Sequence, residues 1–117
     1  MMSASNQSLK LYVNTPFIKR EVFTKNIQAL ERMGHCVINE WDYTLRSDIK
    51  SDLESIKNAD VLIFDVTKFP AFCVEKWLYS ELVLELNKEV WVISSDPIDS
   101  CVSFKDWTAL YSELHPI

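Results

Sequence analysis

Residues 73–94 read CVEKWLYSELVLELNKEVWVIS, a stretch that joins a helical pattern directly to a strand-like run. Its first part has the three-and-four spacing of a single buried helix face, formed by Val74, Trp77, Leu78 and Leu82. In helical projection Glu81 falls between Trp77 and Leu78, in the middle of this apolar face. A carboxylate on an inward face needs a partner or a cavity, because its burial alone is too costly. Glu81 is therefore the first candidate for a functional residue.

Strand patterns surround this stretch along the chain. Short apolar runs predict strands at residues 9–13, 35–39, 60–65 and 89–93. The run at 60–65 is apolar almost throughout, which is typical of a strand that is covered on both faces.

Helical patterns occupy the gaps between these runs. A first helix is predicted from about Lys19, with Gly34 as the left-handed residue that ends it. A second helix is predicted to begin at Ser47 or Asp48, either of which can cap it. The expected inward faces are Val22, Phe23, Ala29, Leu30 and Met33 in the first helix, and Ile49, Leu53 and Ile56 in the second. A short closing helix is expected to carry Trp107, Leu110, Tyr111 and Leu114.

Strands and helices therefore alternate, which predicts an α/β fold of the flavodoxin-like kind. We expect a three-layer architecture, with a parallel sheet of four to five strands and helices on both faces. The length of 117 residues fits one domain, predicted at residues 9–117, and residues 1–8 are expected to be a disordered leader.

Composition and charge exclude several classes of function. The net charge is −5 and no basic patch gathers, so we expect neither a nucleic-acid partner nor a membrane partner. The three cysteines are widely spaced and predict neither a disulfide framework nor a zinc site, and Cys36 is expected in the core. No segment has the length of a membrane span or a signal peptide. A cytoplasmic setting is expected, and no metal or cofactor is implied.

A ligand site is expected at one edge of the predicted sheet. Parallel α/β sheets bind ligands beyond the carboxyl ends of their strands, at a topological switch point. The segments that should form this edge are 14–16, 40–43, 65–69 and 94–96. Acidic and aromatic residues are frequent in these segments, which favours a site there.

The chain resembles the nucleoside 2-deoxyribosyltransferase family and its N-glycoside hydrolase relatives over roughly residues 9–95. The segment KLYVNTPF at 10–17 is similar to the family's opening strand, and LERMGHCV at 30–37 is similar to its L-x-x-x-G-H-x-V turn. NADVLIFD at 58–65 is similar to its A-D-x-x-(I/V)-x-D strand. Residues 79–93 are similar to its nucleophile helix and the following strand.

The resemblance implies cleavage or transfer at the N-glycosidic bond of a nucleoside or nucleotide. Glu81 would attack the anomeric carbon, Tyr12 would orient Glu81, and an acid would protonate the leaving base. Glu75 is in the family's position for that acid, and Asp42 and Asp65 are further candidates. The other residues expected to bind substrate are Asn14, Pro16, Phe17 and Trp77. The resemblance also implies a homodimer or higher homo-oligomer, because family sites are usually completed across a subunit interface.

Two positions depart from the family pattern, and they leave other interpretations open. Thr15 replaces the glycine that follows the first strand, and Trp77 with Leu78 replaces a glycine-containing step before the nucleophile. One alternative is a catalytically inactive module of the same fold that binds a nucleotide or a protein. A second is an NAD-cleaving relative of the Toll/interleukin-1 receptor domain type. Glu85, one turn beyond Glu81, is expected to be a residue of the helix rim or a salt-bridge partner.

Overall fold

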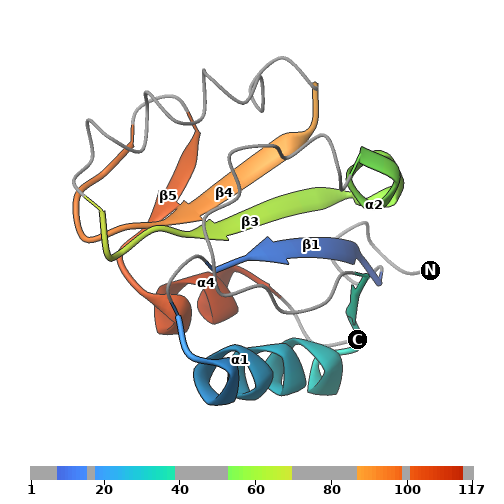
Figure 1. Cartoon of the computed structure of the whole chain (residues 1–117), viewed down its shortest axis with the longest axis horizontal. Coiled ribbons are helices and arrows are strands. Elements are labelled where there is room, and N and C mark those ends of the chain that lie inside the picture. The colour runs from blue at the N-terminus through green and yellow to red at the C-terminus, as the bar shows by residue number, and fades with distance from the viewer. Residues whose placement is uncertain (1–7, 16–17, 39–52, 70–86, 99–100, 115–117) are drawn as a thin grey trace.

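The computed structural model describes residues 8–15, 18–38, 53–69, 87–98 and 101–114. These residues form a five-stranded sheet that is parallel throughout, with the strand order β2-β1-β3-β4-β5. This arrangement confirms the predicted α/β, flavodoxin-like architecture (Figure 1). The strands are β1 (Lys10–Asn14), β2 (Cys36–Val37), β3 (Val61–Asp65), β4 (Glu89–Ile93) and β5 (Val102–Phe104), and the helices are α1 (Arg20–Arg32), α2 (Leu53–Asn58) and α4 (Trp107–Glu113).

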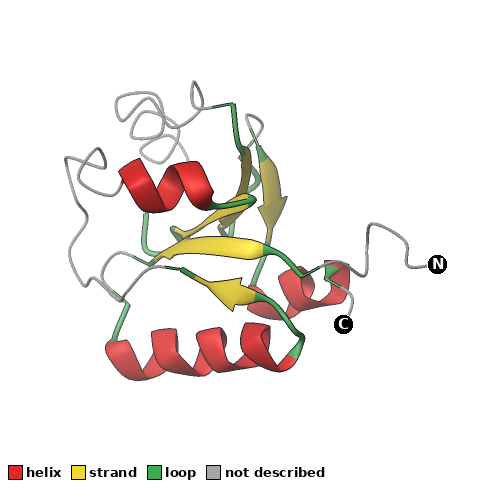
Figure 2. Cartoon of the chain, turned by 90° about the vertical axis from the view of Figure 1, so that its right-hand side faces the viewer, coloured by secondary structure: helices red, strands yellow, loops and turns green. Residues whose placement is uncertain are grey.

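Helices cover both faces of the sheet, as a three-layer fold requires. Helices α1 and α4 lie on one face and α2 lies on the other (Figures 1 and 2). Two apolar clusters fill the spaces between the layers. One cluster joins Phe23 of α1 and Leu110 of α4 to Leu11 and Ile63 of the sheet. The other joins Ile56 of α2 to the residues on the opposite face of the strands.

Strand β3 lies at the centre of the sheet. It pairs with β1 on one side and with β4 on the other, and all five of its residues are buried. The nearly continuous apolar run at 60–65 therefore has the expected cause, because side chains on both faces of a covered strand leave water. The predicted strand at 89–93 is also confirmed, with bounds identical to those of β4.

Helix α1 ends as its sequence predicts, although one residue of its expected inward face is exposed. Gly34 has φ of 97°, a left-handed conformation that a Cβ atom disfavours. Phe23 and Leu30 are buried and Ile27 packs beside them, whereas Val22 is 48% exposed. The prediction for Val22 was wrong, because the stripe that contacts the sheet runs through 23, 27 and 30 and leaves residue 22 outside it.

The expected burial of Cys36 is also wrong. This cysteine is exposed at the start of β2, a two-residue strand at the edge of the sheet. Its partner in the pairing of β2 with β1 is Lys10, which is exposed as well. An apolar sequence pattern alone does not separate an edge strand from a central one, since neighbours on both sides decide burial.

The C-terminal part of the chain adds one strand that the sequence pattern did not predict. After residue 94 the structure has β5 and then α4, which confirms the predicted closing helix. Asp106 caps α4, because its side chain accepts a hydrogen bond of 2.8 Å from the backbone N–H of Ala109. Strand β5 has three residues, too few to show an alternating pattern.

Helix α2 agrees with part of its prediction. Ile56 is 1% exposed, as expected for its inward face. The expected start at Ser47 or Asp48 lies outside the described residues, and so does the helix predicted in the first part of 73–94.

Candidate functional site

The strand order places a topological switch point between β1 and β3. From β1 the chain leads through α1 to β2 on one side, whereas β3 leads toward β4 and β5 on the other. The connections therefore diverge at the carboxyl ends of β1 and β3, and such a divergence opens a crevice in parallel α/β sheets. The edge predicted to hold a ligand is thus formed by these two strand ends and the neighbouring end of β4.

Buried polar residues gather at this edge. The buried polar or charged residues within the described part of the chain are Asn14, Thr15, Asp65, Ser94 and His35. The first four stand at or directly after the carboxyl ends of β1, β3 and β4. Parallel pairing brings these ends together, because Asn14 is in register with Phe64, and Asp65 with Ile93. We call Asn14, Thr15, Asp65 and Ser94 the edge cluster.

Two members of the edge cluster carry buried atoms that lack a hydrogen-bond partner. Asn14 is 7% exposed and Thr15 is 2% exposed, yet Oδ1 of Asn14 and Oγ1 of Thr15 have no partner among the described residues. A buried polar atom in this state costs roughly 1–3 kcal/mol. Both oxygens can accept hydrogen bonds that no described residue donates.

Tyr12 is buried two residues before Asn14, on the same strand. Its side chain is 1% exposed and lies in the cluster between the sheet and α2. The ring packs edge-on against Phe64, with 6.3 Å between the ring centroids. Side chains alternate along a strand, so Tyr12 and Asn14 face the same side of the sheet. The residue expected to pair with Tyr12, Glu81, lies outside the described residues.

The carboxylate of Asp65 is held by two other residues. Its Oδ1 accepts hydrogen bonds from the backbone N–H of Thr67 at 3.2 Å and from the Thr67 hydroxyl at 2.8 Å. Its Oδ2 accepts a hydrogen bond of 2.7 Å from the indole Nε1–H of Trp107. These contacts tie the end of β3 to its following turn and to α4. Asp65 therefore has a structural function in this edge.

Ser94 closes the edge on the side of β4. Its hydroxyl oxygen accepts a hydrogen bond of 3.3 Å from the backbone N–H of Asp96, and its own N–H donates to the carbonyl of Phe104 at 2.9 Å. The hydroxyl thus stabilises the turn that leaves β4.

Only part of the predicted site lies within the described residues. Asn14, Tyr12 and Asp65 are placed at or near one edge of the sheet, in the positions described above. Thr15 and Ser94 were not among the predicted site residues. A polar residue directly after an apolar strand is the sequence signal that marks both of them. The predicted residues outside the described part are Pro16, Phe17, Asp42, Glu75, Trp77 and Glu81.

Clustered metal ligands and long apolar helices are both missing from the described residues. In these ranges no group of three or more His, Cys, Asp or Glu side chains could hold a metal ion. No helix described by the structure is both long and apolar enough to cross a membrane.

Comparison of the chain with models of known protein families, with curated proteins and with solved structures found no match.

Proposed function

We propose that this chain binds a nucleoside or nucleotide at the edge cluster and cleaves or transfers its N-glycosidic bond. The observation that supports the proposal most directly is the pair of orphaned oxygens on Asn14 and Thr15 at the switch point. A ribosyl or deoxyribosyl group carries hydroxyls that donate and accept hydrogen bonds, so it would supply donors of the kind that these oxygens lack. The resemblance of the chain to nucleoside 2-deoxyribosyltransferases agrees with this ligand class.

Catalysis in this proposal uses a carboxylate nucleophile. Glu81 attacks the anomeric carbon, the bond between sugar and base breaks, and water or a second base then takes the glycosyl group from Glu81. Tyr12, which is buried on β1, orients Glu81 in this proposal. Glu75 protonates the leaving base, since the carboxylate of Asp65 is already occupied by Thr67 and Trp107. The proposed active unit is a homodimer in the cytoplasm.

A binding module without catalytic activity is the second candidate. The hydrogen bonds of Asp65 favour it, because one of the acids expected near the base has a structural partner on α4. In that case the edge cluster would still bind the sugar of a nucleotide. The NAD-cleaving alternative uses the same bond type, so NAD belongs in the substrate panel.

To test the proposal, purified protein is incubated with a panel of deoxynucleosides, deoxynucleotides and NAD. The release of free base is measured by chromatography. Wild type should release base from at least one compound, and E81A should release none. Y12F keeps the aromatic ring and its packing but removes the hydroxyl, so it should fold normally and lose most of the activity. E85Q is the matched control, since it changes a glutamate one turn away and should retain activity.

Three results discriminate between the candidates. Activity in wild type that is lost in E81A establishes the N-glycosidase function. Tight binding of a panel member to wild type, with no base released, identifies the binding module. Neither binding nor release by folded protein would refute the proposal. Size-exclusion chromatography with light scattering on the same samples tests the proposed dimer.

A further inference from the structure

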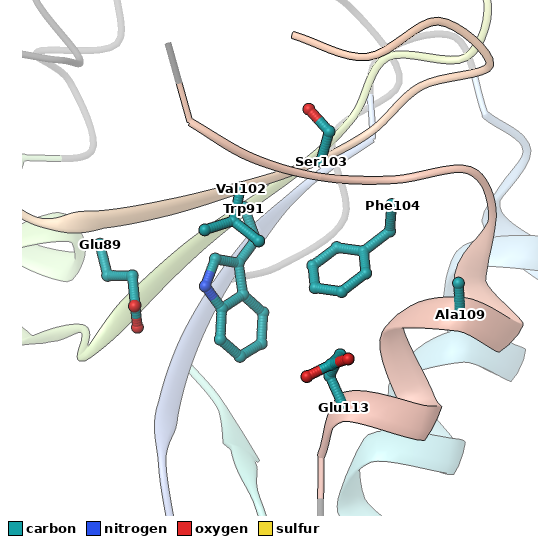
Figure 3. A pocket seen from close by; sticks show the side chains of 7 residues that line it. All are labelled: Glu89, Trp91, Val102, Ser103, Phe104, Ala109 and Glu113. Atoms are coloured by element: carbon teal, nitrogen blue, oxygen red, sulfur yellow. The ribbon is translucent and has the colours of Figure 1, made fainter. Parts of the chain in front are cut away.

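A pocket lies between α4 and the strands β4 and β5. It has a volume of about 510 Å³ and is lined by Glu89, Trp91, Val102, Ser103, Phe104, Ala109 and Glu113 (Figure 3). Glu89 begins β4, whereas Ser94 of the edge cluster follows the end of that strand. Five residues of extended strand span about 16 Å. At its other end the pocket reaches Phe104, whose backbone carbonyl accepts the hydrogen bond from the N–H of Ser94, so the pocket adjoins the edge cluster there while its Glu89 end lies a strand's length away.

The pocket has an aromatic wall. Trp91 is half-buried and packs edge-on against Phe104, with 5.7 Å between the ring centroids and 69° between the ring planes. Trp91 and Glu89 are two residues apart on β4, so both side chains lie on the face of the sheet that α4 covers. A partly exposed indole at a concave surface attracts a cation to its π face.

Two carboxylates flank this aromatic wall. Glu89 and Glu113 are both exposed, and Figure 3 shows the indole of Trp91 between their carboxyl groups. Ala109 stands one turn before Glu113 on α4, and its small side chain leaves the space beside the rings open. Within the part of the chain that the structure describes, neither carboxylate has an ion-pair partner.

The chemistry of the pocket selects a cation with a flat head. Its volume falls within the usual range of small-ligand pockets, roughly 300–1,000 Å³. A guanidinium group stacks on indole and donates paired hydrogen bonds to a carboxylate, whereas an ammonium group is a compact point charge. We propose that this pocket binds a guanidinium group on an aliphatic stem, with the stem against Phe104 and Val102.

The test is isothermal titration calorimetry with matched ligands. Nα-acetyl-arginine amide carries the guanidinium, and Nα-acetyl-citrulline amide has the same shape with a neutral urea in its place. Wild type should bind the arginine compound at least about tenfold more tightly than the citrulline compound, since charged hydrogen bonds are lost in the latter. Agmatine, a free small guanidine, is titrated in parallel.

Matched double variants separate a specific site from general attraction to an acidic protein. E89Q/E113Q should weaken binding of the arginine compound about tenfold or more. E21Q/E31Q removes the same number of charges from exposed positions on α1 and should leave binding within about twofold of wild type. All four substitutions are at exposed side chains, so folding is retained.

Several outcomes overturn the proposal. These are no binding by wild type, equal affinity for the arginine and citrulline compounds, and equal weakening in both double variants. If the capped arginine binds more tightly than agmatine, the proposal is supported and the guanidinium belongs to a peptide. If agmatine binds more tightly than the capped arginine, the proposal is supported and the guanidinium belongs to a free small molecule.

Discussion

The indole Nε1 of Trp107 donates a hydrogen bond of 2.7 Å to Oδ2 of Asp65, which joins the first residue of α4 to the last residue of β3. The two residues are 42 positions apart in the chain. This contact attaches the C-terminal helix to the edge of the sheet where the candidate site lies. It also explains why Asp65 is buried, since its carboxylate has hydrogen-bond donors for both oxygens.

Removing this hydrogen bond should destabilise the protein. W107F takes away the donor and leaves Oδ2 of Asp65 without it, so the free energy of unfolding should fall by roughly 1–3 kcal/mol. Urea denaturation measures the change. D65A and the double variant complete a thermodynamic cycle, in which the coupling energy should be about 1 kcal/mol or more. Strictly additive losses would contradict a direct interaction between the two side chains.

The orphaned hydroxyl of Thr15 should lower the stability of the ligand-free protein. T15V replaces a buried Oγ1 without a described partner by a methyl group of similar size, so it should stabilise the ligand-free protein by up to about 1 kcal/mol. The same change should raise KM or Kd for a substrate of the edge cluster. Thermal and urea unfolding measure the first effect, and ligand titration measures the second.

Thr67 supplies the matched control for T15V. Its hydroxyl donates to Oδ1 of Asp65 at 2.8 Å, so T67V should lower the free energy of unfolding by about 1 kcal/mol. The two Thr→Val changes should therefore act in opposite directions. If T15V were as destabilising as T67V, the hydroxyl of Thr15 would have a stabilising partner and the ligand argument would lose its basis.

Lys88 should stabilise the C-terminal end of α2. Its Nζ donates to the backbone carbonyls of Lys57 at 2.8 Å and Ala59 at 2.9 Å, where the helix leaves carbonyl groups unpaired. K88M keeps most of the side-chain volume but removes the donor, and should cost about 1 kcal/mol in urea denaturation. K105M, at an exposed position, should change stability by less than about 0.5 kcal/mol. Equal effects of the two variants would argue against this capping contact.

His35 should make stability depend on pH. Burial lowers the pKa of His35 from its ordinary value of 6.5, and its Nδ1 accepts a hydrogen bond of 3.1 Å from the N–H of Leu9. The folded state therefore binds fewer protons than the unfolded state at mildly acidic pH. The stability contributed by neutral His35 is complete above pH 6.5 and is lost as pH falls toward the lowered pKa.

Urea midpoints measured between about pH 5 and pH 8 test this dependence. H35N places an amide oxygen near the position of Nδ1 and cannot titrate, so its midpoint should vary less with pH than that of wild type. H115N is the control. It retains His35, so the contribution of His35 to the pH dependence of the urea midpoint should be preserved. An unchanged slope in H35N would show that protonation of His35 does not oppose folding.

Local patterns predicted most of the described fold. The nearly continuous apolar run at 60–65 predicted a strand covered on both faces, and Gly34 predicted the end of α1. Burial on both faces and a left-handed φ each leave a local signal in the sequence. Strand β5 left no such signal, since its three residues are too few for a period. Val22 and Cys36 were placed wrongly because periodicity does not say which neighbour covers a side chain.

The candidate site was predicted as an edge of the sheet, and the sequence singled out Tyr12, Asn14 and Asp65 within the described residues. Asn14 and Asp65 are the last residues of their strands, and Tyr12 lies two residues before the end of its strand. Parallel pairing brings the carboxyl ends of the strands to one edge of the sheet. The sequence did not indicate that Asp65 is bonded to Trp107, or that the oxygens of Asn14 and Thr15 lack partners.

Local sequence patterns therefore predicted four of the five described strands, the helices α1 and α4, and the edge to which polar strand ends go. Contacts between distant segments decide which of those polar groups are satisfied, and they place Glu89 and Glu113 on either side of Trp91. The reason is physical. Secondary structure follows from periods of two and 3.6 residues along the chain, whereas hydrogen bonds and pockets depend on packing between residues far apart in sequence.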